Sequence, residues 1–413
     1  MPRQTPELDG TWKPARRACL CVLAAALVFL PRPRAVGLAT STPATAESPA
    51  TQPAAPQYPR IAMLWSKADV QGEDEWANIA RHDVIVVGPA TIGLQWQAHE
   101  FPGMSETIYQ PSIKVARENL ERIRRLNPSA VVLVEVYFFE DNQKAYPPDH
   151  KWWLRDKDGK KMSFWPGTWQ MDISNVEYCA HVATRMRAVH EALEWRAGIF
   201  IDNVRFDADS RLAWTVLLKA VRKMCGDDMP ILVNAGYMTE DQTWLAPYVN
   251  GIMYEDSIHY LYDKVKDEEA YYARIAAVDA KLRKPTISVN EIFGKRDDTA
   301  AMRRDLIRTL VYTDMAFIYS DSTHGHKHAW HKAWSAPLGR PLAGPAVPQE
   351  GRLARREFAG GTVLWLPPSA KQAVTVKLAS ACREFITGKE LQSVELAPGS
   401  GAILIRPAKI ADK

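Results

Sequence analysis

Two acidic residues stand at the ends of short apolar runs. Asp202 follows Gly198-Ile-Phe-Ile, and Glu255 follows Gly251-Ile-Met-Tyr. No turn residue separates either acid from its run, so each carboxylate belongs to the end of a strand. Buried acids are costly without a partner. Glycoside hydrolysis requires at least two carboxyl groups that face the same point. One protonates the leaving oxygen, and the other attacks the anomeric carbon or activates water.

Other acids end neighbouring apolar runs. Glu135, Glu291 and Asp321 occupy such positions, and Asn234 ends a further run. Each acid taken alone is equally well explained as a helix cap or an ion-pair partner. If Asp202 and Glu255 point away from each other, Glu291 or Glu135 is the next candidate for a catalytic acid. The stereochemistry stays open, since a carboxyl separation of about 5–5.5 Å indicates retention and one of ~6.5–9.5 Å indicates inversion.

Eight short apolar runs predict eight strands that could position these acids. Most of the runs are almost continuously apolar, which is typical of strands covered on both faces of a parallel sheet. The runs are Arg60–Trp65, Asp83–Gly88, Ala130–Phe138, Gly198–Val204, Pro230–Tyr237, Gly251–Glu255, Pro285–Glu291 and Met315–Asp321.

Helical patterns separate these runs. Apolar residues recur every three or four positions over Ile113–Ile123, Tyr271–Leu282 and Met302–Leu310. Eight strands that alternate with helices predict a (β/α)8 barrel of the α/β class, whose typical length is about 250 residues. An open doubly wound sheet is the alternative, and the lack of a Gly-rich phosphate loop after the first strand disfavours it.

The barrel prediction places the first two acids together. Active sites of such barrels lie at the C-terminal ends of the strands, and the side chains of one layer come from alternate strands. Asp202 ends the fourth predicted strand and Glu255 the sixth. We therefore expect the two carboxylates to face one point.

Composition divides the chain into four segments. We expect a signal peptide over residues 1–39, a disordered Ala/Pro/Thr-rich spacer over 40–57, the barrel as catalytic domain over 58–338, and a small antiparallel β-sandwich domain over 339–413. The last prediction rests on short, often alternating apolar runs that Gly-Gly, Pro-Pro and Pro-Gly turns separate.

Residues 1–39 have the pattern of an export signal. Arg16-Arg17 precede the apolar stretch Ala18–Leu30, which is shorter than the ~20 residues that span a bilayer. We expect a secreted or periplasmic protein without a stable membrane span after cleavage; a membrane anchor and a twin-arginine signal are the alternatives. The segment has six basic and two acidic residues and so holds the whole net charge of +4. The neutral remainder predicts no nucleic-acid partner.

Export leaves three cysteines, Cys179, Cys225 and Cys382. An odd number cannot be fully paired within one chain. Cys179 and Cys225 would lie at opposite ends of neighbouring barrel helices, which places them beyond disulfide reach. Cys179 is expected to pack in the core, on a helix that Ser174–Glu177 opens as a capping box.

Tryptophan is unusually frequent, with 14 Trp against 11 Phe. Many of these residues lie at strand ends or in the loops that follow, where flat apolar rings with a polar edge suit the faces of sugars. Trp152, Trp153, Trp165 and Trp169 stand in a polar, Lys-rich loop, so we expect them to contact substrate. Trp214, on a helix, is expected to pack in the core.

Four short motifs, at Ala197–Arg205, Trp165–Asn175, Val233–Gly236 and Val249–Glu255, carry a family resemblance. They resemble glycoside-hydrolase-like (β/α)8 barrel families that are similar to the endo-α-1,4-polygalactosaminidases. The resemblance spans residues 60–325, and the C-terminal segment resembles the β-domain that follows many such barrels. It implies that the acids of the fourth and sixth strands are the catalytic pair.

A histidine tract offers a competing chemistry. Four of the ten histidines fall in His324-Gly-His326-Lys-His328-Ala-Trp-His331, after the last predicted strand. Such a tract can bind a metal, so a metal-dependent hydrolase or deacetylase is the second enzyme class. Against it, no other histidine lies at a strand end, and all the ligands would come from one loop. A carbohydrate-binding barrel without catalysis is the third class, which the presence of both acids disfavours.

The sequence therefore predicts an exported glycoside hydrolase of a polysaccharide, such as an exopolysaccharide or cell-wall glycan, with Asp202 as nucleophile and Glu255 as acid/base. No cofactor and no metal ligand are assigned, and the oligomeric state does not follow from the sequence. The residues expected to contact the carbohydrate are Trp65, Tyr137, Trp165, Trp169, Asn203, Arg205, Asn234, Tyr254, Glu291, Asp321, His324 and His326.

Overall fold

The computed structural model describes residues 57–194, 196–204, 208–236, 241–256, 258 and 267–407. The predicted signal peptide and almost all of the predicted spacer lie outside these ranges, and so does Arg205. None of the helices in the described part of the chain combines the length and the apolar character that a membrane span requires.

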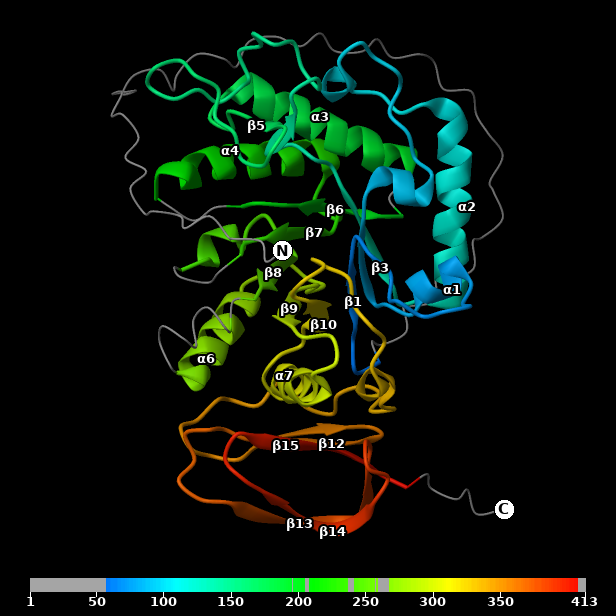
Figure 1. The fold of residues 1–413 in the computed structure, drawn as a ribbon, viewed down its shortest axis with the longest axis vertical. Coiled ribbons are helices and arrows are strands. Elements are labelled where there is room, and N and C mark those ends of the chain that lie inside the picture. The colour runs from blue at the N-terminus through cyan, green and yellow to red at the C-terminus, as the bar shows by residue number, and fades with distance from the viewer. Residues whose placement is uncertain are drawn as a thin grey trace, which may run out of the picture.

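Eight parallel strands form the central sheet (Figure 1). In order round the sheet they are β1 (Ala62–Leu64), β2 (Val84–Val87), β3 (Val131–Glu135), β6 (Gly198–Ile201), β7 (Ile231–Asn234), β8 (Gly251–Glu255), β9 (Val289–Gly294) and β10 (Ala316–Asp321). Each strand pairs in parallel with the next. A parallel bridge between Ile61 and Phe317 brings the two edges together. The predicted (β/α)8 barrel is confirmed.

All eight predicted strands are present, with ends that differ by a few residues. The largest difference concerns β9, which was expected over Pro285–Glu291 and extends over Val289–Gly294. The strand continues past the predicted end because its ladder with β10 reaches Gly294, opposite Asp321. Apolar content alone does not mark this extension, since hydrogen bonding to the neighbouring strand produces it.

Helices pack around the sheet (Figure 1). They are α1 (Glu75–Ala80), α2 (Gln110–Leu126), α3 (Val176–Ala192), α4 (Ala208–Cys225), α6 (Glu268–Asp279) and α7 (Thr299–Tyr312), with 3₁₀ turns at Pro89–Ile92, Pro102–Met104, Thr243–Leu245 and Lys332–Ser335. The predicted capping box of α3 is wrong by one residue. Asn175 is the N-cap and accepts from the N–H groups of Glu177 and Tyr178, whereas the Ser174 hydroxyl donates to Asp172.

Alternate residues of each strand face the barrel interior and the surrounding helices. In β2, Val84 and Val86 belong to the interior cluster, whereas Ile85 and Val87 belong to the cluster between the strands and the helices. Side chains alternate in this way because successive residues of a strand point to opposite faces. Interior positions are therefore two residues apart, and this spacing decides which polar residues at strand ends point inward.

A five-stranded antiparallel sheet follows the barrel. Its strands are β11 (Ala354–Phe358), β12 (Gly361–Leu366), β13 (Val374–Glu384), β14 (Glu390–Leu396) and β15 (Ser400–Ile405), in the order β11-β12-β15-β13-β14. Figure 1 shows two layers, with β12 and β15 beside α7 and with β13 and β14 farther from the barrel. Leu364, Leu396 and Leu404 belong to the apolar cluster of this sheet. The fold class predicted from the sequence is confirmed.

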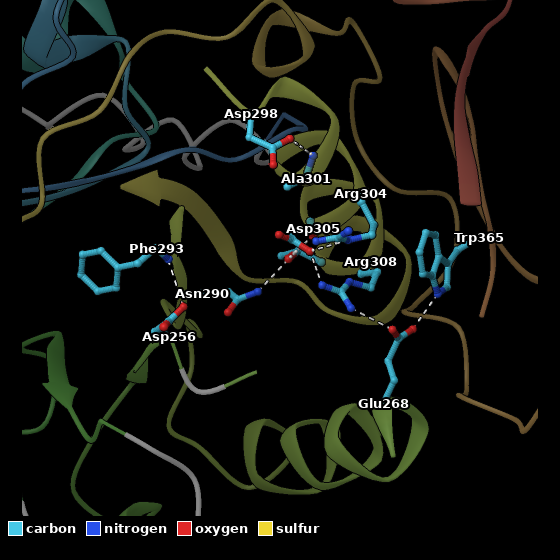
Figure 2. Close-up of polar contacts among 11 residues, drawn as sticks. Asp256, Glu268, Asn290, Phe293, Asp298, Ala301, Arg304, Asp305, Arg308 and Trp365 are labelled. Atoms are coloured by element: carbon cyan, nitrogen blue, oxygen red, sulfur yellow. Dashed lines mark hydrogen bonds and ion pairs between the residues drawn. The ribbon is translucent and has the colours of Figure 1, made fainter. Parts of the chain in front are cut away.

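A buried polar network joins this sheet to the barrel helices (Figure 2). Arg308 of α7 donates to Glu268 of α6 over 2.8 Å and pairs with Asp305 on its own helix. Trp365 of β12 donates its indole N–H to the other oxygen of Glu268 over 2.6 Å. The three charged side chains belong to residues that are at most 5% exposed. Burial strengthens these charge-assisted hydrogen bonds, so the network holds the C-terminal sheet against the barrel.

Cys179, Cys225 and Cys382 are buried and free. The expectation that Cys179 and Cys225 form no disulfide is confirmed. Burial raises the pKa of both of these thiols to about 11. Because the thiolate is the reactive form of cysteine, these two residues act as small apolar core side chains.

Candidate functional site

A layer of polar side chains lies at the C-terminal ends of the barrel strands. Each member stands two residues after an apolar side chain of the barrel interior, so strand alternation turns it inward as well. Asp202 follows Phe200 in this way, and Glu255 follows Met253. The members of this polar layer are Glu135, Asp202, Asn234, Glu255, Glu291 and Ser320.

Asn234 connects Asp202 and Glu255. Its Nδ2 donates to Asp202 Oδ1 over 2.9 Å and to Glu255 Oε2 over 2.8 Å. Its own oxygen accepts from the backbone N–H of Gly236 over 2.8 Å, which determines the orientation of the amide. The two N–H bonds of a planar amide diverge by roughly 120°, and this ideal geometry corresponds to about 5 Å between the two accepting oxygens. Asn234 therefore holds the two acids in one place and at a defined separation.

The two carboxyl groups have different environments. Both oxygens of Asp202 accept amide hydrogen bonds, one from Asn234 and the other from Asn203 over 2.9 Å. Burial raises the pKa of Asp202, and the hydrogen bond from Asn234 opposes the rise. Burial and the charge of Glu291 raise the pKa of Glu255 to about 7. The ionised form is therefore better stabilised at Asp202 than at Glu255, and Glu255 can carry a proton near neutral pH.

Replacing Glu255 by Gln should stabilise the protein at pH 8 and leave its stability at pH 4 unchanged. The folded state favours the protonated carboxyl, so folding stability is lost as the pH rises from the ordinary pKa of 4.5 to about 7. The loss at higher pH is at most about 3 kcal/mol, and the neutral amide removes it. Thermal unfolding at both pH values measures the difference, with Glu350→Gln as an exposed control. A lower melting temperature of Glu255→Gln than of wild type at pH 8 would show that the site does not favour the protonated form of Glu255.

His326 connects the polar layer to the segment after β10. Its Nδ1 lies 2.8 Å from Glu291 Oε1, which also accepts the Ser320 hydroxyl over 2.5 Å. Burial lowers the pKa of His326, but the hydrogen bond to Glu291 and the charge of Glu255 outweigh it and raise the pKa. The expectation that the histidine tract lacks partners across the barrel is therefore wrong, since His326 meets acids from two other strands.

Trp65 covers one side of the layer. Its indole N–H donates to Glu135 Oε2 over 2.6 Å, and its ring centroid lies 4.5 Å from that of His326. Burial and the charge of Asp202 raise the pKa of Glu135 to about 7. Tyr137, two residues farther along, is 41% exposed. Both aromatic residues were expected to contact the carbohydrate, and the structure places Trp65 directly against the polar layer.

Three residues beside the layer have left-handed backbone conformations. They are Trp65 with φ 57°, Asn203 with φ 56° and Asp256 with φ 49°. A left-handed conformation costs a residue such as Trp65 roughly 1–2 kcal/mol, whereas Asn and Asp adopt it more readily. Asp256 is held by its N–H, which donates to the Glu291 carbonyl, and by its carboxylate, which accepts from the N–H of Phe293 (Figure 2). Such strain concentrates at functional sites, and here it surrounds the polar layer.

Two of the residues predicted to contact the carbohydrate are turned away from the layer. Tyr254 is fully buried in the cluster between the strands and the helices, because it stands one residue before the inward-facing Glu255. Its expected role is therefore wrong. Asp321 also stands one residue from an inward position, that of Ser320, and pairs over 3.0 Å with the exposed His324. Arg205 lies outside the described residues.

The segment after β3 contains a hairpin that was not expected from the sequence, formed by β4 (Glu140–Asn142) and β5 (Thr168–Gln170). Trp152 and Trp153 are only 7% and 2% exposed, so the expectation that they contact substrate is wrong. They form part of the core that supports the hairpin. Trp165 is 53% exposed, and Lys161 Nζ lies 3.5 Å above the ring of Trp169. Trp165 thus stays available to a ligand.

Sequence reasoning missed Ser320 and the bridging position of Asn234. A signal for both was present, because counting two residues onward from each interior apolar residue reaches every member of the polar layer. To use this signal, one must know which of the two alternating sets of residues in each strand faces the barrel interior. In almost continuously apolar strands, the sequence does not distinguish the two sets.

A family model described as hypothetical glycosyl hydrolase family 15 matches residues 134–362, more than half of the chain. The chain is similar to the noncanonic maltogenic α-amylase AmyB from Thermotoga neapolitana, with 10% identity, a TM-score of 0.49, and coverage of 84% of this chain and 98% of that chain. It is also similar to the cyclic α-maltosyl-(1→6)-maltose hydrolase from Arthrobacter globiformis, with 14% identity, a TM-score of 0.48, and coverage of 83% and 97%. A comparison with curated proteins found no match.

Proposed function

The chain belongs to hypothetical glycosyl hydrolase family 15, and from this membership we propose an exported, retaining hydrolase of a polysaccharide with Asp202 as nucleophile and Glu255 as acid/base. The observation that carries the proposal is the double hydrogen bond from Asn234 to the two carboxylates. Ideal amide geometry corresponds to about 5 Å between the two accepting oxygens. A separation of about 5–5.5 Å is the one that retaining glycosidases use.

The environments of the two acids support the division of roles. Asp202, whose two oxygens accept amide hydrogen bonds, attacks the anomeric carbon as a carboxylate. Glu255, whose pKa is raised to about 7, gives its proton to the leaving oxygen. The glycosidic bond breaks, and an ester forms between the sugar and Asp202. Glu255, now ionised, then removes a proton from water, which attacks the anomeric carbon and releases Asp202.

The surroundings support a carbohydrate ligand of some length. Trp65 borders the polar layer, and Tyr137 and Trp165 present exposed aromatic surface. Rings of this kind suit the apolar faces of sugars. The motifs of this chain resemble those of families similar to the endo-α-1,4-polygalactosaminidases. A galactosamine polymer is therefore the first substrate to test, followed by other exopolysaccharides and cell-wall glycans. The basic and apolar segments within residues 1–39 support export.

The stereochemistry of the product tests the proposal. We expect the purified chain to cleave at least one glycan of such a panel, and proton NMR of the first product to show the anomeric configuration of the substrate. Retention follows because two successive displacements occur at the same carbon. A product of inverted configuration would exclude Asp202 as a nucleophile. Binding of a glycan without turnover would favour the carbohydrate-binding alternative.

A further inference from the structure

Glu255, Glu291 and His326 form a group whose ligand atoms all lie within 4.8 Å of one another. Glu255 ends β8, Glu291 lies in β9, and His326 follows β10. Three neighbouring parts of the barrel thus supply one ligand each. Regular elements position such ligands more precisely than loops do, and two of these three residues belong to strands.

Glu291 has an unsatisfied oxygen in this group. The residue is fully buried, and its Oε1 contacts both His326 and Ser320. Its Oε2 is buried as well and has no hydrogen-bond partner among the described residues. A buried acceptor without a partner is unfavourable, and more so when it is charged. A cation bound between Glu291 and its neighbours would supply the missing partner.

The donors of the group suit a transition metal. Carboxylate oxygen and imidazole nitrogen are ligands of Zn²⁺, whereas Ca²⁺ and Mg²⁺ favour oxygen alone. Two ionised carboxylates also balance the charge of a divalent ion. Three protein ligands leave the fourth tetrahedral position to water, and the side chain of His326, which is 27% exposed, provides the side from which an ion can enter.

We propose that Glu255, Glu291 and His326 bind one Zn²⁺ ion and that the bound ion blocks glycan hydrolysis. The block rests on the proposed function, because a Glu255 oxygen that coordinates a metal cannot deliver a proton to a leaving group. The binding itself does not depend on that function. Bound Zn²⁺ replaces the hydrogen bond between His326 and Glu291.

Titration calorimetry with Zn²⁺ tests the binding on the full-length chain after removal of metals with a chelator. We expect one ion per chain, with affinity at least about tenfold weaker in His326→Ala and in Glu291→Gln. His324→Ala is the matched control, because this exposed histidine lies in the same tract and outside the group. Equal affinity in wild type and His326→Ala would overturn the proposal, as would a loss of affinity in His324→Ala alone.

Thermal unfolding shows whether each variant is folded and whether Zn²⁺ stabilises it. Zn²⁺ should raise the melting temperature of wild type and of His324→Ala, because a ligand that binds the folded state stabilises it. It should leave that of His326→Ala unchanged. Should His326→Ala melt early without metal, His326→Gln replaces it, since an amide keeps a hydrogen bond to Glu291. A Zn²⁺-dependent rise in His326→Gln equal to that of wild type would also overturn the site.

Turnover of a glycan substrate tests the block separately. We expect Zn²⁺ to inhibit wild type at the concentrations that saturate the calorimetric site, and we expect a chelator to restore turnover. Binding without any hydrolase activity in metal-free protein would count against the proposed function and leave the site standing. Activity that Zn²⁺ increases would overturn the block. Activity without any Zn²⁺ binding would overturn the site and leave the proposed function standing.

Discussion

Replacing Asp202 by Asn should abolish the hydrolysis of every glycan that the wild-type chain cleaves. The amide has nearly the shape of the carboxylate, so it can keep contacts with Asn234 and Asn203. It lacks the negative charge that attacks the anomeric carbon, and without that attack no glycosyl ester forms. We expect turnover to fall to the background rate on natural substrates and on aryl glycosides alike.

Glu255→Gln should give a different pattern. The variant cannot protonate the leaving oxygen, and the loss of a general acid lowers kcat on natural glycans by about 10²–10⁴-fold. A dinitrophenyl glycoside has a leaving group that needs no proton, so the first step should remain fast on this substrate. Hydrolysis of the ester should then become rate-limiting, and a burst of dinitrophenolate should precede the steady state. Azide, which attacks without base catalysis, should accelerate the second step.

Steady-state and burst kinetics of both variants check these results. Asp297→Asn is a suitable control, because this exposed aspartate follows β9 and lies outside the polar layer. It should turn over at the wild-type rate. Wild-type turnover in Asp202→Asn or in Glu255→Gln would remove that residue from the mechanism. A burst in Asp202→Asn rather than in Glu255→Gln would reverse the two assigned roles.

Replacing Arg308 by Ala should lower the free energy of unfolding by about 3–5 kcal/mol. Arg308 lies between Glu268 and Asp305, and all three are almost fully buried (Figure 2). Without the guanidinium, two buried carboxylates lose their buried cation, and Trp365 of the C-terminal sheet still donates to one of them. Removing one partner of a buried ion pair is costly because the other charge stays behind, unpaired and away from water.

Denaturant unfolding of Arg308→Ala and Arg304→Ala measures this effect. Arg304 contacts the same Asp305 over 3.4 Å, but its side chain is 45% exposed. Water screens such a pair, so Arg304→Ala should cost no more than about 1 kcal/mol. Similar losses in the two variants would show that burial does not set the strength of the network. If Arg308→Ala had the same free energy of unfolding as wild type, the network would be excluded as a link between the barrel and the C-terminal sheet.

The acids of the proposed pair could be chosen from the sequence because they directly follow strong apolar runs. Asp202 and Glu255 each continue a strand without an intervening turn, and both lie in the polar layer. Tyr254 illustrates the limit of that reasoning. It stands beside Glu255 in the chain, yet it faces the helices. Adjacent residues of a strand point to opposite faces, and an apolar run that is buried on both sides does not reveal which face is inner.

Side-chain partners between distant segments were also beyond sequence reasoning. His326 was one of four similar histidines in a short tract, and only the course of the chain after β10 brings it to Glu291. Its neighbour His328 pairs with the buried His82 instead. Trp152 and Trp153 stand in a polar segment but pack beneath a hairpin. Composition around a residue describes its neighbours in the chain, whereas burial depends on neighbours in space.

The sequence by itself determined the order of strands and helices, and with it the barrel and the position of acids at strand ends, because hydrophobic periodicity and strand length are local properties. Tertiary structure alone decided what holds the two predicted acids together, the amide of Asn234, and which neighbouring residues face inward or outward. It also decided which histidine joins them. These outcomes depend on hydrogen bonds between residues far apart in the chain, which form only when the barrel closes.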